Sequence, residues 1–574
     1  MVKERLKKLV LEALQMAQSH GQLNIQRLPE QIIFERPKDK THGDFSTASA
    51  LILGSQLKIS PLSIAKIIKD DLDTIKEKNF VARVEVVPPG FINFFLTPNW
   101  LQETLKEIEQ KKSKFGCSEL GQGLKVQLEF VSANPVGPVH LGHGRWAVLG
   151  DTLARVLMAA GFKVEKEFYV NDYGSQMDLF GQSVSAKYCE LLGQSVVYPE
   201  AGYRGQYITD IAQSIINEHG DKYLSFSLEE REKGLSTLGA KQVLEEMKKV
   251  LSKLGVQFDS WFSETTLHDS GAVRQTIDAL KAADFTYEKE KAVWFKSKAF
   301  GDDKDRVLVR QGGDGKKTPS EGLSTYFAAD IAYHRDKLNR GFKGLINIWG
   351  ADHHGYVKRM QAAIQAFGYP KDTLEVILGQ LVNLFRDRKP VRMSKRTGEM
   401  VTLEELLDEV GKDPVRFFFL MRSTDTPLDF DIDLAKKRSE ENPVYYVQYA
   451  HARISSIIRF AQEKGLKVPG LDEVDLELLN EEPELDLIRK LAQFEEVVET
   501  AALKRTPYIL TQYVRDVATA FHFFYHRCRV IGNKDSATGS GKNLDLARLF
   551  LIDCVKIILK NALELMGISA PEKM

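Results

Sequence analysis

Residues 129–151 read EFVSANPVGPVHLGHGRWAVLGD and mark the start of an α/β domain. The apolar run KVQLEFV (125–131) predicts a short buried strand, and the Pro/Gly-rich segment 134–144 predicts a loop. A helix should follow and end at Gly161, a residue that suits a C-terminal cap. The next strand is predicted at FKVEKEFYV (162–170). Strand, loop, helix and strand in this order predict a parallel sheet.

The α/β pattern is interrupted and then resumes. Residues 186–285 are mainly helical in periodicity, which indicates an insertion. A strand and a glycine turn are predicted at VLVRQGGDGKK (307–317), and helices alternate with strands over 325–380. We therefore expect one Rossmann-like parallel-sheet domain, formed by 111–185 and 286–400 and split by the insertion.

Two further domains flank this one. Residues 1–110 predict a small α/β N-terminal domain, with two amphipathic helices and two strands within 82–96 that meet at a Pro-Pro-Gly turn. From 436 to 574 the pattern is almost wholly helical, which predicts an all-α helical bundle at the C-terminus. Residues 401–435 are expected to connect it to the α/β domain.

Composition limits the classes of protein that the chain can belong to. Its 574 residues include 79 Lys and Arg and 79 Asp and Glu, so a basic surface over the whole chain is excluded. The four cysteines, Cys117, Cys189, Cys528 and Cys554, are too few and too scattered for a disulfide scaffold, which favours a reducing compartment. None forms a C-x-x-C pair, which argues against a structural zinc site. No apolar run approaches the roughly 18 residues of a membrane-spanning helix. We expect a cytoplasmic monomer with no structural metal, no membrane partner and no DNA partner.

The pair His140 and His143 stands at the predicted start of the helix after the first strand. Two alternatives are open for such a pair, either histidines that only hydrogen-bond at a helix start or a metal site. The context favours a third reading. Gly142 and Gly144 let a ligand approach the backbone, and the N–H groups of a helix N-terminus attract phosphate. The pattern therefore indicates a nucleotide site.

A basic segment, RDRKPVRMSKRTG (386–398), follows the last predicted strand of the same domain. The simple alternative is a solvated basic loop. The functional interpretation is that Lys395 neutralises charge on a polyphosphate leaving group, with Ser394 in the turn beside it.

These two segments together resemble the class I aminoacyl-tRNA synthetases, and longer strings resemble the arginyl-tRNA synthetases within that class. The strings are spread along the chain from the N-terminal unit to the last residue: HGDFSTASA (42–50), residues 129–151 above, FYVNDYGSQMDLFGQSV (168–184), FDSWFSE (258–264), YFAADIAYH (326–334), GADHHGYVKRM (350–360), NPVYYVQYAHARI (442–454) and APEKM (570–574). The resemblance implies arginine–tRNA ligase activity with ATP and Mg²⁺, through an arginyl-adenylate that passes arginine to the 2′-hydroxyl of the terminal adenosine of tRNA(Arg). It also implies that the first step needs bound tRNA.

Residue roles carry over where the residues match the pattern of the family. The catalytic residues implied are His140, His143 and Lys395. The residues implied to bind ATP are His140, Gly142, His143, Gly350, Asp352, Met393, Ser394 and Lys395. The residues implied to bind arginine are Ser132, Ala133, Asn134, His143, Tyr326, Asp330 and His353. Arg392 and Arg396 replace a lysine and a serine of the family pattern, and His353 replaces glutamine.

The charge and shape of the guanidinium group support the arginine-binding residues that the resemblance implies. The guanidinium of arginine stays charged, so a selective site needs a fixed carboxylate that can accept its two parallel N–H bonds. Tyr326 and Asp330 are four residues apart, so on a helix they share a face. The alternative is that Asp330 is an ordinary surface acid.

The sequence contains fewer signals for RNA binding than for the small-molecule site. The helical domain holds basic clusters at 436–438 and 526–529 with interleaved tyrosines, which are able to stack unpaired bases but also fit a helical core. The resemblance implies that this domain binds the anticodon and that residues 1–110 touch the tRNA. Two other functions stay open: a tRNA-binding protein that has lost catalysis, and a small-molecule nucleotidyltransferase with the same H-x-G-H chemistry.

Overall fold

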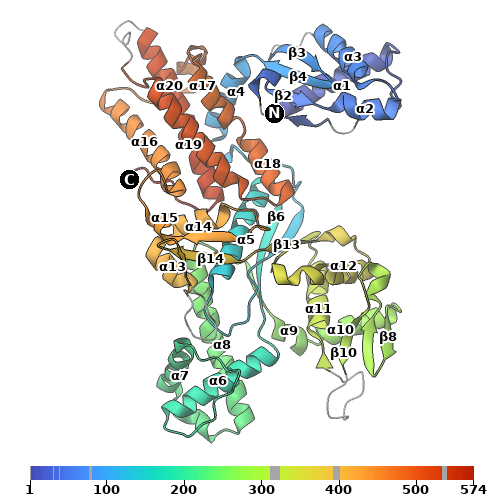
Figure 1. Cartoon of the computed structure of the whole chain (residues 1–574), viewed down its shortest axis with the longest axis vertical. Coiled ribbons are helices and arrows are strands. Elements are labelled where there is room, and N and C mark those ends of the chain that lie inside the picture. The colour runs from blue at the N-terminus through green and yellow to red at the C-terminus, as the bar shows by residue number, and fades with distance from the viewer. Residues whose placement is uncertain are drawn as a thin grey trace. The chain divides into compact units, whose positions relative to one another are not determined.

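A computed structural model describes residues 2–29, 32–37, 39–75, 80–310, 323–391, 401–532 and 540–574 of the chain (Figure 1). The chain divides into two compact units. The first comprises Met1–Lys112, Ile458–Ala492 and Ala520–Val555, and the second comprises Ser113–Ile457, Gln493–Thr519 and Lys556–Met574.

The first unit contains a four-stranded antiparallel sheet in the order β1-β2-β4-β3. Its strands are β1 (Phe34–Glu35), β2 (Phe45–Thr47), β3 (Val81–Val87) and β4 (Phe91–Leu96). The turn at Pro88-Pro89-Gly90 joins β3 to β4, so the predicted hairpin is confirmed. The helices of this part of the chain are α1 (Val2–Ser19), α2 (Ser49–Leu57), α3 (Pro61–Thr74) and α4 (Asn99–Lys111). Leu6, Leu14 and Ile64 lie in the core between α1 and α3.

The second unit is built on a five-stranded parallel sheet, as the sequence predicts. Its order is β13-β12-β5-β6-β7. The strands are β5 (Lys125–Glu129), β6 (Lys163–Val170), β7 (Ser260–Ser263), β12 (Gly344–Gly350) and β13 (Leu374–Gly379). Between them run α5 (Leu141–Ala159), α11 (Tyr326–Asn339) and α12 (Val357–Ala366). Gly161 follows α5 with φ 86°, a left-handed conformation that glycine adopts without strain.

The helical insertion differs from the expected one at both ends. Figure 1 shows its three long helices as a separate group: α6 (Ser175–Leu191), α7 (Gln206–His219) and α8 (Leu228–Lys253). The first of them starts before residue 186. Strand β7, inside the expected insertion, pairs with β6 and forms one edge of the parallel sheet. Only four residues long and lacking an apolar alternation, β7 gives no strand signal of its own.

Two smaller sheets complete the α/β part. Of their strands, the sequence predicts the one within 307–317, whose glycine turn lies outside the described residues. One is antiparallel, with β8 (Thr286–Lys289), β9 (Ala292–Phe295), β10 (Arg306–Arg310) and β11 (Leu323–Ser324). The other joins β14 (Val382–Arg386), β15 (Lys389–Pro390) and β16 (Leu428–Asp431). Helices α9 (Glu264–Asp269), α10 (Ala272–Ala282), α13 (Leu403–Val410), α14 (Lys412–Leu420) and α15 (Ile432–Lys436) lie around them in sequence.

The C-terminal region is helical, which confirms that part of the predicted fold. Its helices are α16 (Pro443–Glu463), α17 (Glu482–Leu491), α18 (Phe494–Lys504), α19 (Ile509–Arg527) and α20 (Ser540–Leu565). Within the described residues, no helix combines the length and the apolar character that crossing a bilayer requires.

Candidate active site

The order in which strands are added to the parallel sheet changes side at β5. From β5 the chain continues to β6 and β7 on one side, whereas β12 and β13 lie on the other side. Ligands of open parallel sheets bind at such a switch point, beyond the carboxyl ends of the strands. His140 lies after β5 and Gly350 ends β12, so the topology places both at this point.

His140 is the N-cap of α5. Its Nδ1 accepts a hydrogen bond from the His143 backbone N–H at 3.3 Å, and the two imidazole rings stack with centroids 3.5 Å apart. A Cβ on Gly142 would come within 3.1 Å of the His140 ring, so glycine leaves room for that ring. The structure therefore brings both histidines together at a helix N-terminus, where the N–H groups and the helix dipole favour an anion.

The chain at Thr402 and Leu403 lies beside His140. Thr402 forms an antiparallel bridge with His140, and the Leu403 N–H donates to the Val139 carbonyl at 3.0 Å. Thr402 also caps α13, because its hydroxyl accepts from the Glu405 N–H at 3.2 Å. The expected site residues Met393, Ser394 and Lys395 themselves lie outside the described residues.

Gly350 is the last residue of β12, and Asp352 lies two residues beyond it. A Cβ on Gly350 would lie 2.5 Å from Asp352 Oδ1, so the carboxylate folds back over the end of the strand. The side chain of Asp352 is 83% exposed and that of His353 is 56% exposed. Both side chains therefore face solvent, where they can reach a ligand.

Asp330 lies on α11 and accepts a hydrogen bond from the Tyr356 hydroxyl. Burial raises the pKa of Asp330 to about 7; the Tyr356 bond opposes the rise, and the charges of Glu264 and Glu129 add to it. The charged form of a carboxyl in that position is unfavourable unless a cation binds beside it. A guanidinium group would supply the missing positive charge.

The charges of three acidic side chains act on the buried hydroxyl of Tyr169. Glu129 ends β5 and is 5% exposed, and Glu264 begins α9 and is 2% exposed. Burial raises the pKa of Tyr169 on β6, and the nearby charges of Asp330, Glu264 and Glu129 raise it further. We call Asp330, Glu264, Glu129 and Tyr169 the acidic pocket.

One buried cation offsets part of this negative charge. Lys337, fully buried on α11, lies with its Nζ 2.6 Å from Glu129 Oε2, and burial lowers its pKa. It also donates to Asn347 Oδ1 at 3.2 Å. The Asn347 amide contacts His334, whose pKa burial lowers well below the ordinary value, so His334 is neutral. Among the described residues, Lys337 pairs with Glu129 and with neither Asp330 nor Glu264. A cationic ligand beside Asp330 would favour its charged form.

Of the expected arginine-binding residues in the loop after β5, Ser132 contacts the acidic pocket, and the others have partners outside it. Ser132 Oγ donates to Glu129 Oε1 at 2.9 Å and accepts from the Tyr169 N–H at 3.2 Å. Asn134 Nδ2 donates to the Asn171 carbonyl at 3.0 Å, and the Ala133 carbonyl accepts from the Asn171 N–H at 3.4 Å. These bonds fix the loop after β5.

Two further observations concern that loop and Tyr326. Val131 and Ser132 have φ of 73° and 36°, a strained conformation for residues with a side chain, and such strain concentrates at functional sites. Tyr326 begins α11, is 57% exposed and lies 3.3 Å from Ser175 Oγ through its hydroxyl. Tyr326 and Asp330 thus have different partners, although both lie on α11.

Sequence reasoning did not assign Glu264, Tyr169 or Tyr356. Glu264 is the last residue of FDSWFSE (258–264), and the other two lie in quoted strings, so the residues were visible but their roles were not. In the part of the chain that the structure describes, no group of three or more His, Cys, Asp or Glu side chains is arranged to hold a metal ion.

Comparison with known proteins gives a consistent result along the chain. The family model for the arginyl-tRNA synthetase N-terminal domain matches residues 4–96. The class I (R) tRNA synthetase catalytic-domain model matches residues 104–418, and the DALR anticodon-binding domain model matches 447–574. The catalytic-domain match covers the sheet and both histidines.

Proteins that match over the full length of the chain belong to the same family. The arginine–tRNA ligase of Caldanaerobacter subterraneus is 48% identical over 573 residues, covering 100% of this chain and 99% of that protein. The arginine–tRNA ligase of Desulforamulus reducens is 46% identical with the same coverage. The solved arginyl-tRNA synthetase of Thermus thermophilus shares the fold, with a TM-score of 0.77, 23% identity and 100% of both chains covered. With its sheet, its paired histidines and these matches, the chain belongs to the arginyl-tRNA synthetases of class I.

Proposed function

We propose that the chain is an arginine–tRNA ligase whose acidic pocket binds the side chain of arginine beside an ATP site at the start of α5. The acidic pocket carries the proposal, because the buried Glu129 and Glu264 and the partly buried Asp330 are only partly compensated by cations and favour a cationic ligand. The arginine–tRNA ligases that match over the full length support the same activity.

Arginine recognition follows from the charges. Asp330 and Glu264 would accept N–H bonds from the planar guanidinium, and Tyr169 would contribute its buried hydroxyl. Lysine lacks the fork that matches a carboxylate, and citrulline lacks the charge. Ser132, Ala133, Asn134, Tyr326 and His353 would border the rest of the amino acid.

The first reaction joins arginine to ATP. The arginine carboxylate attacks the α-phosphorus in line, the bond to the bridging oxygen breaks, and pyrophosphate leaves. His140, His143 and Lys395 would stabilise the charge that develops on the phosphates, and Gly350 and Asp352 would border the ribose. Gly142, Met393 and Ser394 would complete the ATP site.

Mg²⁺ would arrive with ATP. The described residues offer no dedicated metal cage, and Mg²⁺ is commonly held by phosphates and waters with few protein ligands. The ion would neutralise phosphate charge in the same reaction.

The second reaction transfers arginine to RNA. The 2′-hydroxyl of the terminal adenosine of tRNA(Arg) attacks the carbonyl carbon of arginyl-adenylate, AMP leaves, and the hydroxyl proton passes to the departing phosphate. We infer that the helical C-terminal domain holds the anticodon, which the match at 447–574 supports, and that residues 1–110 contact the tRNA.

Pyrophosphate exchange tests the proposal. With tRNA present, exchange of labelled pyrophosphate into ATP should depend on arginine and on no other amino acid, and it should require tRNA. Exchange that depends on a different amino acid would overturn the assignment of the acidic pocket.

A further inference from the structure

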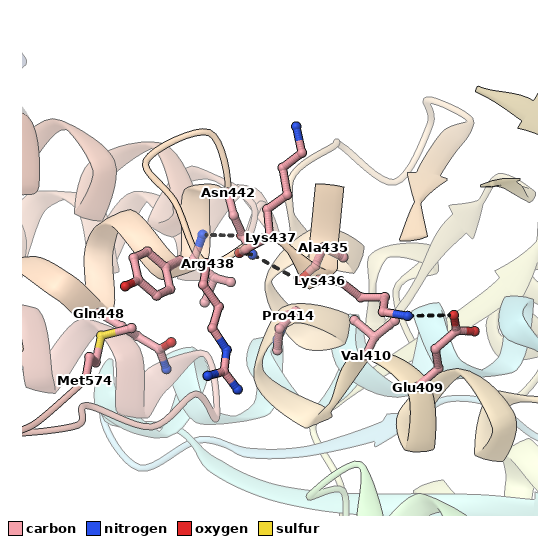
Figure 2. A pocket seen from close by; sticks show the side chains of 12 residues that line it. Glu409, Val410, Pro414, Ala435, Lys436, Lys437, Arg438, Asn442, Gln448 and Met574 are labelled. Atoms are coloured by element: carbon pink, nitrogen blue, oxygen red, sulfur yellow. Dashed lines mark hydrogen bonds and ion pairs between the residues drawn. The ribbon is translucent and has the colours of Figure 1, made fainter. Parts of the chain in front are cut away.

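The pocket between the connective segment and α16 is a polar region outside the candidate active site (Figure 2). In it, Lys436 pairs with Glu409, with Nζ 3.1 Å from Oε1, and the Asn442 amide donates to the Lys437 carbonyl at 2.8 Å. Its basic residues 436–438 form a cluster already considered for RNA binding, so the pocket supports no separate function. A different polar cluster, at the loop after β6, bears directly on the acidic pocket.

Asp172 lies in that loop, two residues beyond the end of β6. Its Oδ2 accepts a hydrogen bond from the Ser263 hydroxyl at 2.6 Å, and its Oδ1 accepts from the Thr265 N–H at 3.0 Å. The Thr265 hydroxyl lies 3.1 Å from the same Oδ1 and 3.2 Å from the Asp172 carbonyl. Ser263 and Thr265 are the neighbours of Glu264 in the sequence. One carboxylate therefore holds the residues on both sides of Glu264.

Asp172 also replaces a local cap at the start of α9. Ser263 occupies the N-cap position, but its hydroxyl makes no capping bond within the helix. The Thr265 N–H is one of the first N–H groups of a helix, which have no partner inside it, and Asp172 accepts from it. Because α9 has only six residues, it is too short to be stable alone, and its position depends on contacts of this kind.

The next residue of the loop contacts the last turn of α9. The Tyr173 ring stacks on the His268 ring, with centroids 3.7 Å apart and planes 12° from parallel. His268 lies one turn after Glu264, and its Nε2 is 3.8 Å from Glu264 Oε1. The loop after β6 thus holds both ends of the short helix that carries Glu264.

The position of Glu264 matters for the substrate. Its side chain is buried, so it has little freedom to move toward a ligand after binding. A charge-assisted bond to a planar guanidinium depends on both distance and direction. A displacement of about 1 Å in such a group can cost up to about 100-fold in function.

We propose that Asp172 is a positioning residue for arginine recognition, which fixes the start of α9 so that Glu264 presents its carboxylate to the guanidinium. The proposal rests on the proposed function, in which Glu264 accepts N–H bonds from the substrate. Both carboxylate oxygens of Asp172 have partners at the start of α9, so Asp172 acts through Glu264.

The kinetics of arginine-dependent pyrophosphate exchange, with tRNA present, test this role. Asp172→Ala should raise the KM for arginine about tenfold, and it should leave the KM for ATP and the maximal rate unchanged. Asp172→Asn should restore the wild-type KM, because its amide oxygen still accepts from the Thr265 N–H and its amide nitrogen donates to the Ser263 hydroxyl. Asp269→Ala, which removes an exposed acid from the same helix, is the matched control and should change nothing.

A double-mutant cycle separates positioning from general stability. In a Glu264→Gln background Asp172→Ala should add little, because the carboxylate that it positions is already gone. If Asp172→Ala does not fold, Ser263→Ala takes its place in the cycle; it removes one bond and should raise the KM for arginine about threefold.

Two outcomes would overturn the positioning role: a KM for arginine that is the same in Asp172→Ala and Asp269→Ala, or losses that multiply fully in the double variant. Pyrophosphate exchange by the wild-type chain that does not depend on arginine would instead overturn the proposed function.

Discussion

Thr402 is paired with His140 through the backbone, so the chain that leaves the segment 392–400 is anchored on the first histidine of the H-x-G-H sequence. At the other end of that segment the Val391 N–H donates to the Leu384 carbonyl at 2.8 Å. Ten residues, 392–401, separate Val391 from Thr402 in the sequence. The arrangement supports the proposal that Lys395 acts on the same phosphates as His140 and His143.

Lys395→Ala should therefore reduce the rate of pyrophosphate exchange about 100- to 1,000-fold, the usual loss when one transition-state charge contact is removed. Its effect on tRNA affinity should be small. The control is Lys389→Ala, which removes an exposed charge on β15. Equal losses of rate and tRNA affinity in Lys395→Ala would contradict a catalytic role.

Asp330→Asn should raise the KM for arginine about 10- to 100-fold, because a charge-assisted bond to the guanidinium is replaced by a neutral one. The KM for ATP should change little. Initial rates at varied arginine and ATP check this, with the exposed Asp278→Asn on α10 as control. Unchanged arginine use would show that Asp330 does not bind the side chain.

The raised pKa of Asp330, about 7, makes arginine binding depend on pH. Below that pH the carboxyl is increasingly neutral while arginine remains charged, so the KM for arginine should rise about tenfold for each further pH unit. Above it the KM should level off. Asp330→Asn should remove this dependence, and a wild-type KM that stays flat below pH 7 would refute the assignment.

Glu264→Gln should also raise the KM for arginine, because it removes a second buried carboxylate from the acidic pocket. We expect about a tenfold effect, with Glu288→Gln on the exposed side of β8 as the control. If Glu264→Gln binds arginine as wild type does while Asp330→Asn does not, Asp330 alone reads the guanidinium.

Asp151 is the acid at the centre of a buried cluster of charged side chains in the second unit. Its carboxylate lies 2.7 Å from an Arg416 nitrogen, with both side chains fully buried, and 2.9 Å from Arg155 Nε. Burial alone would raise the pKa of Asp151, but Arg416, Arg155 and Lys166 outweigh it and hold the pKa below the ordinary value. The stability that Asp151 contributes is therefore present near neutral pH and is lost as pH falls through the lowered pKa.

Asp151→Asn should lower the free energy of unfolding by about 3–5 kcal/mol, since it leaves Arg416 buried without its counter-charge. Glu190→Gln, which breaks the surface pair with Lys187, should cost less than about 1 kcal/mol. Urea unfolding at neutral pH measures both, and similar values for the two variants would contradict the buried-cluster account.

The sequence predicted the parallel sheet because β5, α5 and β6 are local elements with clear apolar periodicity and a Pro/Gly-rich loop between them. It did not predict β7, whose four residues become a strand only through pairing with β6. Short elements of this kind depend on tertiary contacts more than on their own residues.

The candidate site also has residues that the sequence predicts and residues that it does not. The helix-start histidines follow from a contiguous segment, so their stacking was accessible from spacing. The acidic pocket draws Glu129, Tyr169, Glu264 and Asp330 from four separate elements. Lys337 lies 208 residues from its partner Glu129, and no local pattern signals such a pair.

Aminoacylation of total tRNA with each radiolabelled amino acid measures whether this chain charges tRNA with arginine. We expect acid-precipitable label with arginine alone, dependent on ATP and reduced about 10- to 100-fold in Asp330→Asn at low arginine. Label from another amino acid, or tight tRNA binding with no label from any of them, would contradict it.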